Sequence, residues 1–210
     1  MRKLTATIFI TALGASALQA QPKKMERSVE KQRLAVEAWT ACIADENPQE
    51  VGDMLKRDYR EDGYKEAIQQ LAEKRVSSEC FNAMPRDYRK ITLGGLPFAG
   101  GLAERMIERD PEPLLKRLSM AAVRPEAVVF SYTDQVASCI TRGAPHVVAK
   151  LFATDINSAD EQAALAEIEP VKGVCTSQGA EIEASPLAMR SMLATAAFRL
   201  LESQKGESDA

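Results

Sequence analysis

The feature that most constrains this 210-residue chain is a cysteine pattern that occurs twice. Cys42 is followed by Cys80, and Cys139 is followed by Cys175. The first cysteines of the two pairs lie 97 positions apart (139 − 42), and the second ones lie 95 apart (175 − 80). The flanking residues also match, with Ala-Cys-Ile in one copy and Ser-Cys-Ile in the other, each followed by a proline and an apolar segment. The spacing therefore predicts one small helical unit present twice in tandem.

The first twenty residues have the pattern of a secretory signal peptide. Arg2 and Lys3 precede an apolar run over 4–13, and small residues follow as far as Ala20. A membrane anchor needs about 20 apolar residues, and this run is shorter. We therefore expect residues 1–20 to be a signal peptide, and the protein to be exported, to the periplasm or out of the cell, without stable insertion into a membrane.

The charge of the chain indicates which partners to expect. Loss of Arg2 and Lys3 with the signal peptide changes the formal net charge from −3 to −5. A mildly acidic protein has no basic field that would attract nucleic acid or an anionic membrane surface. We therefore expect no nucleic-acid partner.

Four cysteines in an exported protein are most simply two disulfides. Three pairings are possible. We favour Cys42–Cys80 and Cys139–Cys175, because a unit that once existed alone carried two cysteines that could pair with each other. A cross-pairing between the two units is the alternative.

Helical spacing of apolar residues and helix-start patterns predict an all-α fold. We expect Asn47 to cap a helix that begins at Pro48, and Ser158 to cap a helix in the second copy. Two extended segments, near Ile91 and Ile182, could pair as one short β-ribbon. The expected helices cover residues 28–45, 48–55, 64–75, 98–109, 111–122, 125–141, a short segment from 145, a segment from 158, and 186–202.

This pattern predicts two similar disulfide-closed helical units related by a pseudo-twofold axis. The expected organisation along the chain is a signal peptide (1–20), a polar linker (21–27), helical repeat unit 1 (28–110), a linking helix (111–124), helical repeat unit 2 (125–202) and a disordered tail (203–210).

The sequence contains few groups that favour catalysis or metal binding. The one histidine, His146, lies in the first turn of an expected helix, and we interpret it as a surface residue. A single histidine without a Cys-x-x-Cys motif does not predict a zinc site. The segment 58–63 resembles only part of a calcium loop, and a solvated turn is the better interpretation. The glycines over 94–101 lack the Gly-Lys-Ser/Thr ending of a phosphate loop, so we expect a turn and close helix packing there. We predict no catalytic, cofactor-binding or metal-binding residues and no cofactor.

Methionine and tryptophan side chains are expected to serve packing. Trp39 lies one helical turn before Cys42, so its ring could cover the disulfide. Flexible methionine side chains fill a core or line an apolar groove. Those on expected helices are Met106, Met120, Met189 and Met192.

The repeated pattern resembles a group of uncharacterised exported alphaproteobacterial proteins built of tandem two-cysteine helical units. The residues that carry the resemblance are Ala41-Cys42-Ile43 with Pro48 and Cys80, then Ser138-Cys139-Ile140 with Pro145 and Cys175, and the closing helices at 102–104 and 193–195. The resemblance implies a topology and an oxidising compartment. It implies no activity.

Three functions fit these expectations. The first is a non-catalytic periplasmic or secreted protein that binds a protein or envelope partner through the groove between its halves. The second is a carrier of a small apolar ligand near Met106 and Met192. The third is a small hydrolase whose carboxylates converge in a pocket with a positioned polar group. The sequence does not define the oligomeric state.

Overall fold

The computed structural model describes residues 28–176, 180 and 182–205, and over these ranges the chain is helical with no β-strand. One 3-10 turn, Arg86–Arg89, accompanies the α-helices. The helices are α1 (Val29–Glu46), α2 (Pro48–Leu55), α3 (Asp62–Ala72), α4 (Ser78–Ala83), α5 (Gly95–Glu108), α6 (Leu114–Ala122), α7 (Tyr132–Gly143), α8 (Pro145–Phe152), α9 (Ala159–Cys175) and α10 (Pro186–Lys205).

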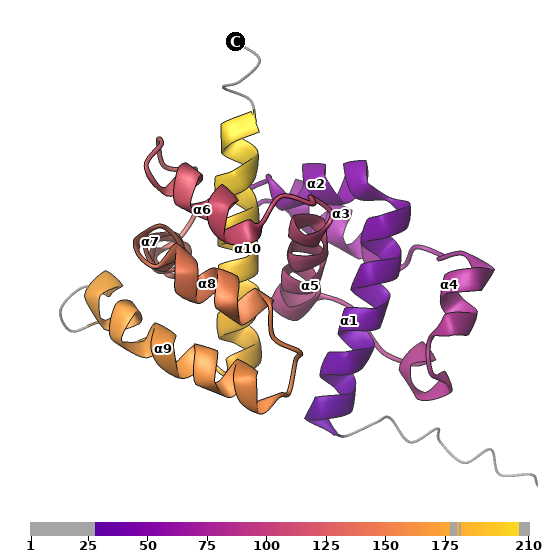
Figure 1. The fold of residues 1–210 in the computed structure, drawn as a ribbon. Coiled ribbons are helices and arrows are strands. Elements are labelled where there is room, and N and C mark those ends of the chain that lie inside the picture. The colour runs from indigo at the N-terminus through magenta and orange to yellow at the C-terminus, as the bar shows by residue number, and fades with distance from the viewer. Residues whose placement is uncertain (1–27, 177–179, 181, 206–210) are drawn as a thin grey trace, which may run out of the picture.

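Helices α5 and α10 lie against each other at the centre of the fold (Figure 1). Helices α1 to α4 lie on one side of this pair and α7 to α9 on the other, so the chain forms two halves with α6 between them in sequence. Phe98 and Leu102 of α5 and Leu193 and Ala197 of α10 are fully or almost fully buried, and they belong to one continuous apolar core. Burial of this apolar surface is the main force that holds the halves together.

Serine side chains fix the starts of several helices. Ser28, Ser77, Ser131 and Ser158 each accept a hydrogen bond from a backbone N–H group in the first turn that follows. Such caps satisfy donors that have no partner inside the helix. The predicted cap at Ser158 is thus confirmed.

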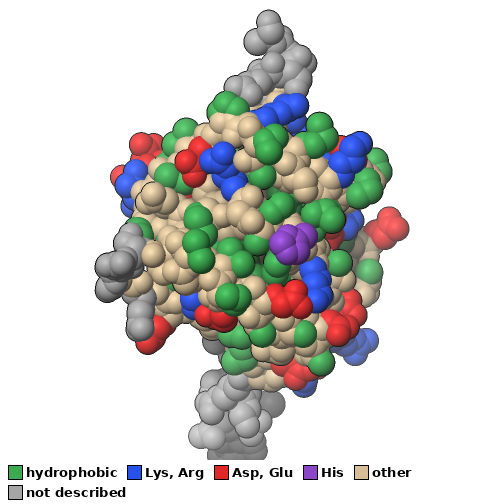
Figure 2. Space-filling model, turned by 60° about the vertical axis from the view of Figure 1, so that its left-hand side comes forward, with side chains coloured by type: hydrophobic (Ala, Val, Ile, Leu, Met, Phe, Trp, Pro, Cys, Tyr) green, Lys and Arg blue, Asp and Glu red, His purple; other side chains and the backbone are tan. Residues whose placement is uncertain are grey.

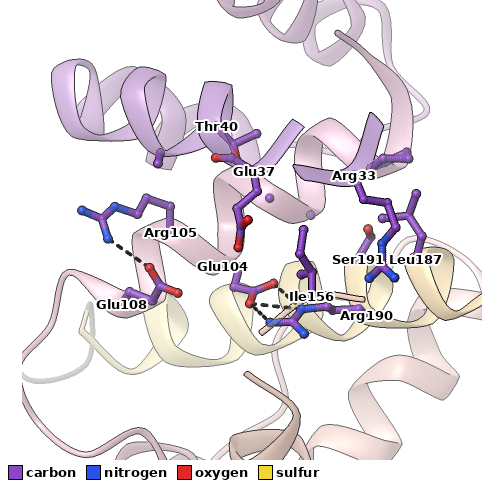
Figure 3. A pocket seen from close by; sticks show the side chains of 14 residues that line it. Arg33, Glu37, Thr40, Glu104, Arg105, Glu108, Ile156, Leu187, Arg190 and Ser191 are labelled. Carbon is purple, nitrogen blue, oxygen red and sulfur yellow. Dashed lines mark hydrogen bonds and ion pairs between the residues drawn. The ribbon is translucent and has the colours of Figure 1, made fainter. Parts of the chain in front are cut away.

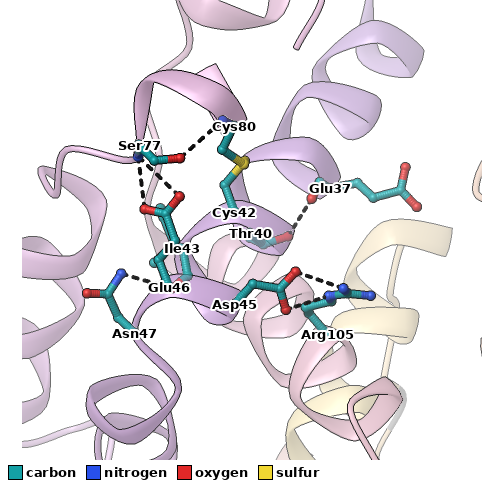
Figure 4. Close-up of a disulfide and its surroundings, with 10 residues drawn as sticks. All are labelled: Glu37, Thr40, Cys42, Ile43, Asp45, Glu46, Asn47, Ser77, Cys80 and Arg105. Atoms are coloured by element: carbon teal, nitrogen blue, oxygen red, sulfur yellow. Dashed lines mark hydrogen bonds and ion pairs between the residues drawn. A yellow bond between two sulfur atoms is a disulfide. The ribbon is translucent and has the colours of Figure 1, made fainter. Parts of the chain in front are cut away.

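Both predicted disulfides are present, as Cys42–Cys80 and Cys139–Cys175, and the cross-pairing is wrong. The first bond joins α1 to α4 (Figure 4). Ser77, at the start of α4, donates its backbone N–H to both carboxylate oxygens of Glu46, so the same two helices are also joined by hydrogen bonds. Trp39 lies edge-on to Phe81, which follows Cys80, and donates its indole N–H to the carbonyl of Tyr88 over 2.8 Å. The tryptophan therefore serves packing, as predicted.

Several predicted boundaries are wrong. The linking helix begins at Leu114, after Pro113, because Asp110 accepts the N–H of Glu112 in a turn. The helix expected over 125–141 begins only at Tyr132. The last helix extends to Lys205, so 203–205 do not belong to a disordered tail. The remainder of that tail, the signal peptide and the polar linker lie outside the described residues.

Two further expectations fail for identifiable reasons. Asn47 does not cap α2 with its side chain. It donates its amide to the carbonyl of Ile43 and so closes the end of α1. The predicted β-ribbon is also wrong, because residues 90–93 and 182–183 form no strand. Leu93 and Ile182 instead pack individually against the helical core.

None of the helices in the described ranges is both long enough and apolar enough to cross a membrane.

Candidate functional site

Two clefts flank the central α5–α10 pair, and each is lined by residues from both halves. We call the first the aromatic cleft, because tyrosine, leucine, isoleucine and methionine side chains form its walls. Its volume is about 470 Å³. It is lined by Leu55, Tyr59, Tyr64, Lys65, Ile68, Gly95, Leu96, Ala99, Thr133, Asp134, Met192, Thr195 and Arg199.

The walls of the aromatic cleft are held by aromatic contacts. The ring of Tyr59, in the loop between α2 and α3, meets the rings of Tyr64 and Phe130 edge-to-face at 6.4 and 5.9 Å between centroids. The Tyr59 hydroxyl is hydrogen-bonded to the hydroxyl of Ser131, the residue that caps α7. The loop of the first half is therefore anchored on the second half at the edge of the cleft.

One buried ion pair lies in the aromatic cleft. Arg199 of α10 donates to Asp134 of α7, and their side chains are 10% and 5% exposed. Asp134 also accepts the backbone N–H of Phe130 over 2.9 Å. The guanidinium group of Arg199 lies over the Phe130 ring, 5.4 Å from its centroid. These contacts fix the arginine in one orientation, with a neutralising carboxylate on one side.

The second cleft, which we call the polar cleft, is smaller, with a volume of about 250 Å³, and carries several charged side chains (Figure 3). It is lined by Arg33, Glu37, Thr40, Ala41, Pro97, Gly100, Gly101, Glu104, Arg105, Glu108, Ile156, Leu187, Arg190 and Ser191.

A buried ion network forms one wall of the polar cleft. Glu161 of α9 is fully buried and accepts hydrogen bonds from Arg33 of α1, at 2.5 and 2.9 Å, and from Arg190 of α10, at 3.0 Å. Arg190 also binds Glu104 of α5 through Nε and Nη2. Four helices, α1, α5, α9 and α10, are thus tied together by alternating charges. Burial alone would raise the pKa of Glu161, but the bonds from Arg33 and the Asn157 backbone N–H, with the charge of Arg190, hold it below the usual value.

Two carboxyl groups that line the polar cleft have raised pKa values, in contrast to Glu161. Burial raises the pKa of Glu104, although Arg190 opposes the shift. The pKa of Glu37 is raised by burial and by the negative charge of Glu104, toward which its carboxylate points (Figure 3). Among the described residues no side chain forms an ion pair or hydrogen bond with the Glu37 carboxylate. Glu37 is therefore the uncompensated charge of this cleft.

The residues that line the two clefts are related by constant spacings in the sequence. Glu37 and Asp134 are 97 residues apart (134 − 37), and so are Tyr59 and Ile156 (156 − 59), the spacing of the first cysteines. On the central helices, a spacing of 91 relates a second set of lining residues from one cleft to the other. The pairs are Leu96 with Leu187, Ala99 with Arg190, Gly101 with Met192, Glu104 with Thr195, and Glu108 with Arg199.

The residues considered from the sequence lie mostly away from these clefts. His146 is exposed on α8, and Figure 2 shows the histidine on the molecular surface. Asp58 accepts hydrogen bonds from the side chain and backbone N–H of Arg60, in a turn between α2 and α3. The described residues contain no group of three or more His, Cys, Asp or Glu side chains placed to hold a metal ion.

The glycines and methionines divide between packing and the clefts. Gly100 and Gly101 allow close packing of α5 against Ser191 and Thr40, as expected. Met189 is buried, Met106 packs beside Gly52, and Met120 is half exposed on α6. Met192 lines the aromatic cleft, so only one of the two methionines expected near a ligand lies there.

The charged residues of the clefts were missed by the sequence analysis. Arg33 and Glu161 are 128 positions apart, and Asp134 and Arg199 are 65 apart. No local pattern relates such residues. One feature of the sequence could have indicated them. Each of these charged residues lies on a helix that otherwise buries apolar residues, and a buried charge requires a partner.

No known protein family, curated protein or solved structure matches this chain, so the functional argument depends on the geometry of the two clefts.

Proposed function

We propose that this protein is a non-catalytic binding protein that holds a small, mainly apolar ligand in the aromatic cleft between its halves. The observation that carries the proposal is a cavity of about 470 Å³ with aromatic and aliphatic walls. Sites for small molecules have volumes of about 300–1,000 Å³ and few, precisely placed polar groups. The aromatic cleft has both properties.

The size of the cleft supports a small ligand more than a macromolecule. A stable protein partner covers about 800 Å² on each surface, and its central contacts are apolar. The aromatic cleft is a local concavity, and charged side chains of both signs are interspersed on the face drawn in Figure 2. A protein or envelope partner, the first of our three expectations, thus remains a prediction with less support.

The polar cleft supports hydrolysis as a second candidate function. Glu37 and Glu104 share this cleft with Arg190, and the pKa of each carboxyl is raised. A carboxyl with a raised pKa is suited to act as a general acid. If this is its role, purified protein hydrolyses chromogenic glycosides or esters, and the Glu37→Gln variant does not. Hydrolysis at the same rate by the variant would exclude Glu37 from the reaction.

The proposed fold history is a tandem duplication that placed two like units about a pseudo-twofold axis. Three features support it. Helices α2 and α8 each have eight residues and begin with proline. The residues before them, Asn47 and Ala144, have nearly the same backbone angles, φ −135°, ψ 49° and φ −137°, ψ 58°. The corresponding lining residues of the two clefts are the third feature.

We also propose that the protein is exported to the periplasm or out of the cell. The two disulfides support this compartment, because such bonds persist mainly in oxidising surroundings.

Titration with a neutral apolar dye, N-phenyl-1-naphthylamine, tests the binding proposal. We expect fluorescence to rise and saturate at one dye per chain. The Thr195→Phe variant should abolish the rise by filling the aromatic cleft, since Thr195 is a half-buried lining residue. Val174→Phe is the matched control, because Val174 is 84% exposed on α9 and lines neither cleft. Equal dye binding by both variants would contradict the proposed site.

A further inference from the structure

The polar groups of the aromatic cleft define the charge that its ligand must carry. Three charged residues line the cleft: Lys65, Asp134 and Arg199. Both oxygens of Asp134 are already engaged, Oδ1 by Arg199 and Oδ2 by the N–H of Phe130. A cationic ligand would therefore find no free carboxylate there. This contrasts with the polar cleft, where the Glu37 carboxylate has no partner among the described residues.

Arg199 retains unused hydrogen-bond donors. A guanidinium group carries five N–H donors, and within the described chain only Nη2 of Arg199 donates to a protein group, Asp134. The side chain is nine-tenths buried, and the face of its guanidinium group lies over the Phe130 ring. Its unpartnered nitrogens are not sealed from solvent, so an acceptor in the cleft can reach them, and hydrogen bonds between a guanidinium and an anion are about twice as strong as neutral ones.

Tyr64 provides a second donor on the wall formed by α3. Its hydroxyl has no hydrogen-bond partner in the part of the chain that the structure describes. Burial raises the pKa of Tyr64, so the hydroxyl stays protonated and can donate at neutral pH. Lys65 lies next to it in sequence, exposed at the rim and paired with Asp62 over 2.9 Å. A ligand anion would thus meet two donors inside the cleft and a cation at its mouth.

From this arrangement we infer that the ligand of the aromatic cleft is an anionic amphiphile, with an apolar body among Ile68, Leu96 and Met192 and one carboxylate bound by Arg199 and Tyr64. The inference rests on the proposed function of the same cleft and narrows its ligand class. An uncharged apolar molecule would leave the remaining donors of Arg199 unused, and a cation would find no free carboxylate, because both oxygens of Asp134 are engaged.

Calorimetric titration of the full chain with three decyl compounds separates these cases. The compounds are decanoate, decanol and decyltrimethylammonium, which share a tail and differ in the charge of the head group. We expect decanoate to bind at least about tenfold more tightly than either of the others, the factor typical of a charge-assisted hydrogen bond.

Two variants test the assigned residues. Tyr64→Phe removes one hydroxyl at a half-buried position and should weaken decanoate binding by up to about tenfold, while leaving decanol unchanged. Arg199→Met leaves Asp134 buried without a partner, so it is combined with Asp134→Asn, which retains an oxygen for the N–H of Phe130. The double variant should bind decanoate no more tightly than decanol, and circular dichroism checks that it folds.

The outcomes distinguish the two proposals. Preference for decanoate that is lost in the variants supports the inference. Equal binding of all three compounds, or preference for the ammonium compound, overturns the anionic class and leaves an apolar binding site in place. Preference for decanoate that survives in the double variant overturns the role of Arg199. Failure of all three compounds to bind overturns the proposed function as well.

Discussion

Gly100 of α5 lies directly against Ser191 of α10, where a Cβ atom on the glycine would be 2.4 Å from the serine Cβ and 2.5 Å from its Cα. The two residues are 91 positions apart (191 − 100), the same spacing that separates lining residues of the two clefts on α5 and α10. Contact between corresponding positions is what a pseudo-twofold axis through the α5–α10 crossing would produce. The crossing therefore depends on the absence of a side chain at residue 100.

Gly100→Ala is expected to lower the free energy of unfolding by about 3 kcal/mol, because the backbone of α10 must move to admit the methyl group. Gly63→Ala is the control, since a Cβ atom there would meet nothing within 4 Å and alanine favours the helix. Urea denaturation measures both. Equal stability of the two variants would show that the helices are not packed as closely as described.

Glu161→Gln should lower stability by about 3–5 kcal/mol at neutral pH, because two buried arginines lose their shared counter-ion. Glu167→Gln is the control on the same helix. Its partner is Lys150, both side chains are about half exposed, and a change within about 0.5 kcal/mol is expected.

The effect of Glu161 should depend on pH in a defined direction. Its pKa in the folded protein is below the ordinary value of 4.5, so its contribution to stability is complete above about pH 4.5 and is lost as the pH falls through the folded pKa. The stability difference between wild type and Glu161→Gln should therefore shrink in acid. A difference that is constant from pH 7 to pH 3 would argue against a buried, ionised Glu161.

The Glu37→Gln substitution should have the opposite effect and raise the stability of the folded protein at neutral pH. The pKa of Glu37 is raised in the folded protein, so ionisation of this group opposes folding above its folded pKa. The variant should have a higher melting temperature than wild type at pH 7, and the gain should vanish below about pH 4, where the carboxyl is protonated in both states. Glu66→Gln, exposed on α3, should not change the melting temperature.

Removal of either disulfide by a pair of Cys→Ser substitutions should cost about 4 kcal/mol, because the closed loops have nearly equal separations of 38 and 36 residues. Non-reducing peptide mapping of the wild type should recover Cys42 linked to Cys80 and Cys139 linked to Cys175. A strong difference between the two double variants would show that the cost is not set mainly by loop closure.

Local signals predicted the parts of the fold that depend on neighbouring residues. Pro48 and Pro145 begin helices because proline suits the first helical position, and Ser158 caps the helix that follows it. The disulfide pairing followed from the repeated cysteine spacing. Each of these features is determined within about forty residues of chain.

Features that depend on tertiary contacts were not predictable in this way. The apolar segment before Ser131 has helical spacing, but β-branched valines and the bond from the Phe130 N–H to Asp134 keep it out of α7. The networks around Glu161 and Arg199 join helices far apart in sequence, so neither the ion pairs nor the clefts they line could be found before the helices were placed.

The most direct test of the binding site is a methyl NMR titration of protein labelled at its methionine Cε carbons with N-phenyl-1-naphthylamine. Met192 lines the aromatic cleft, whereas Met120 lies on α6 and lines neither cleft. We predict that the Met192 methyl signal shifts progressively to saturation and that the Met120 signal does not. A shift of Met120 with no change at Met192 would contradict a ligand site in the aromatic cleft.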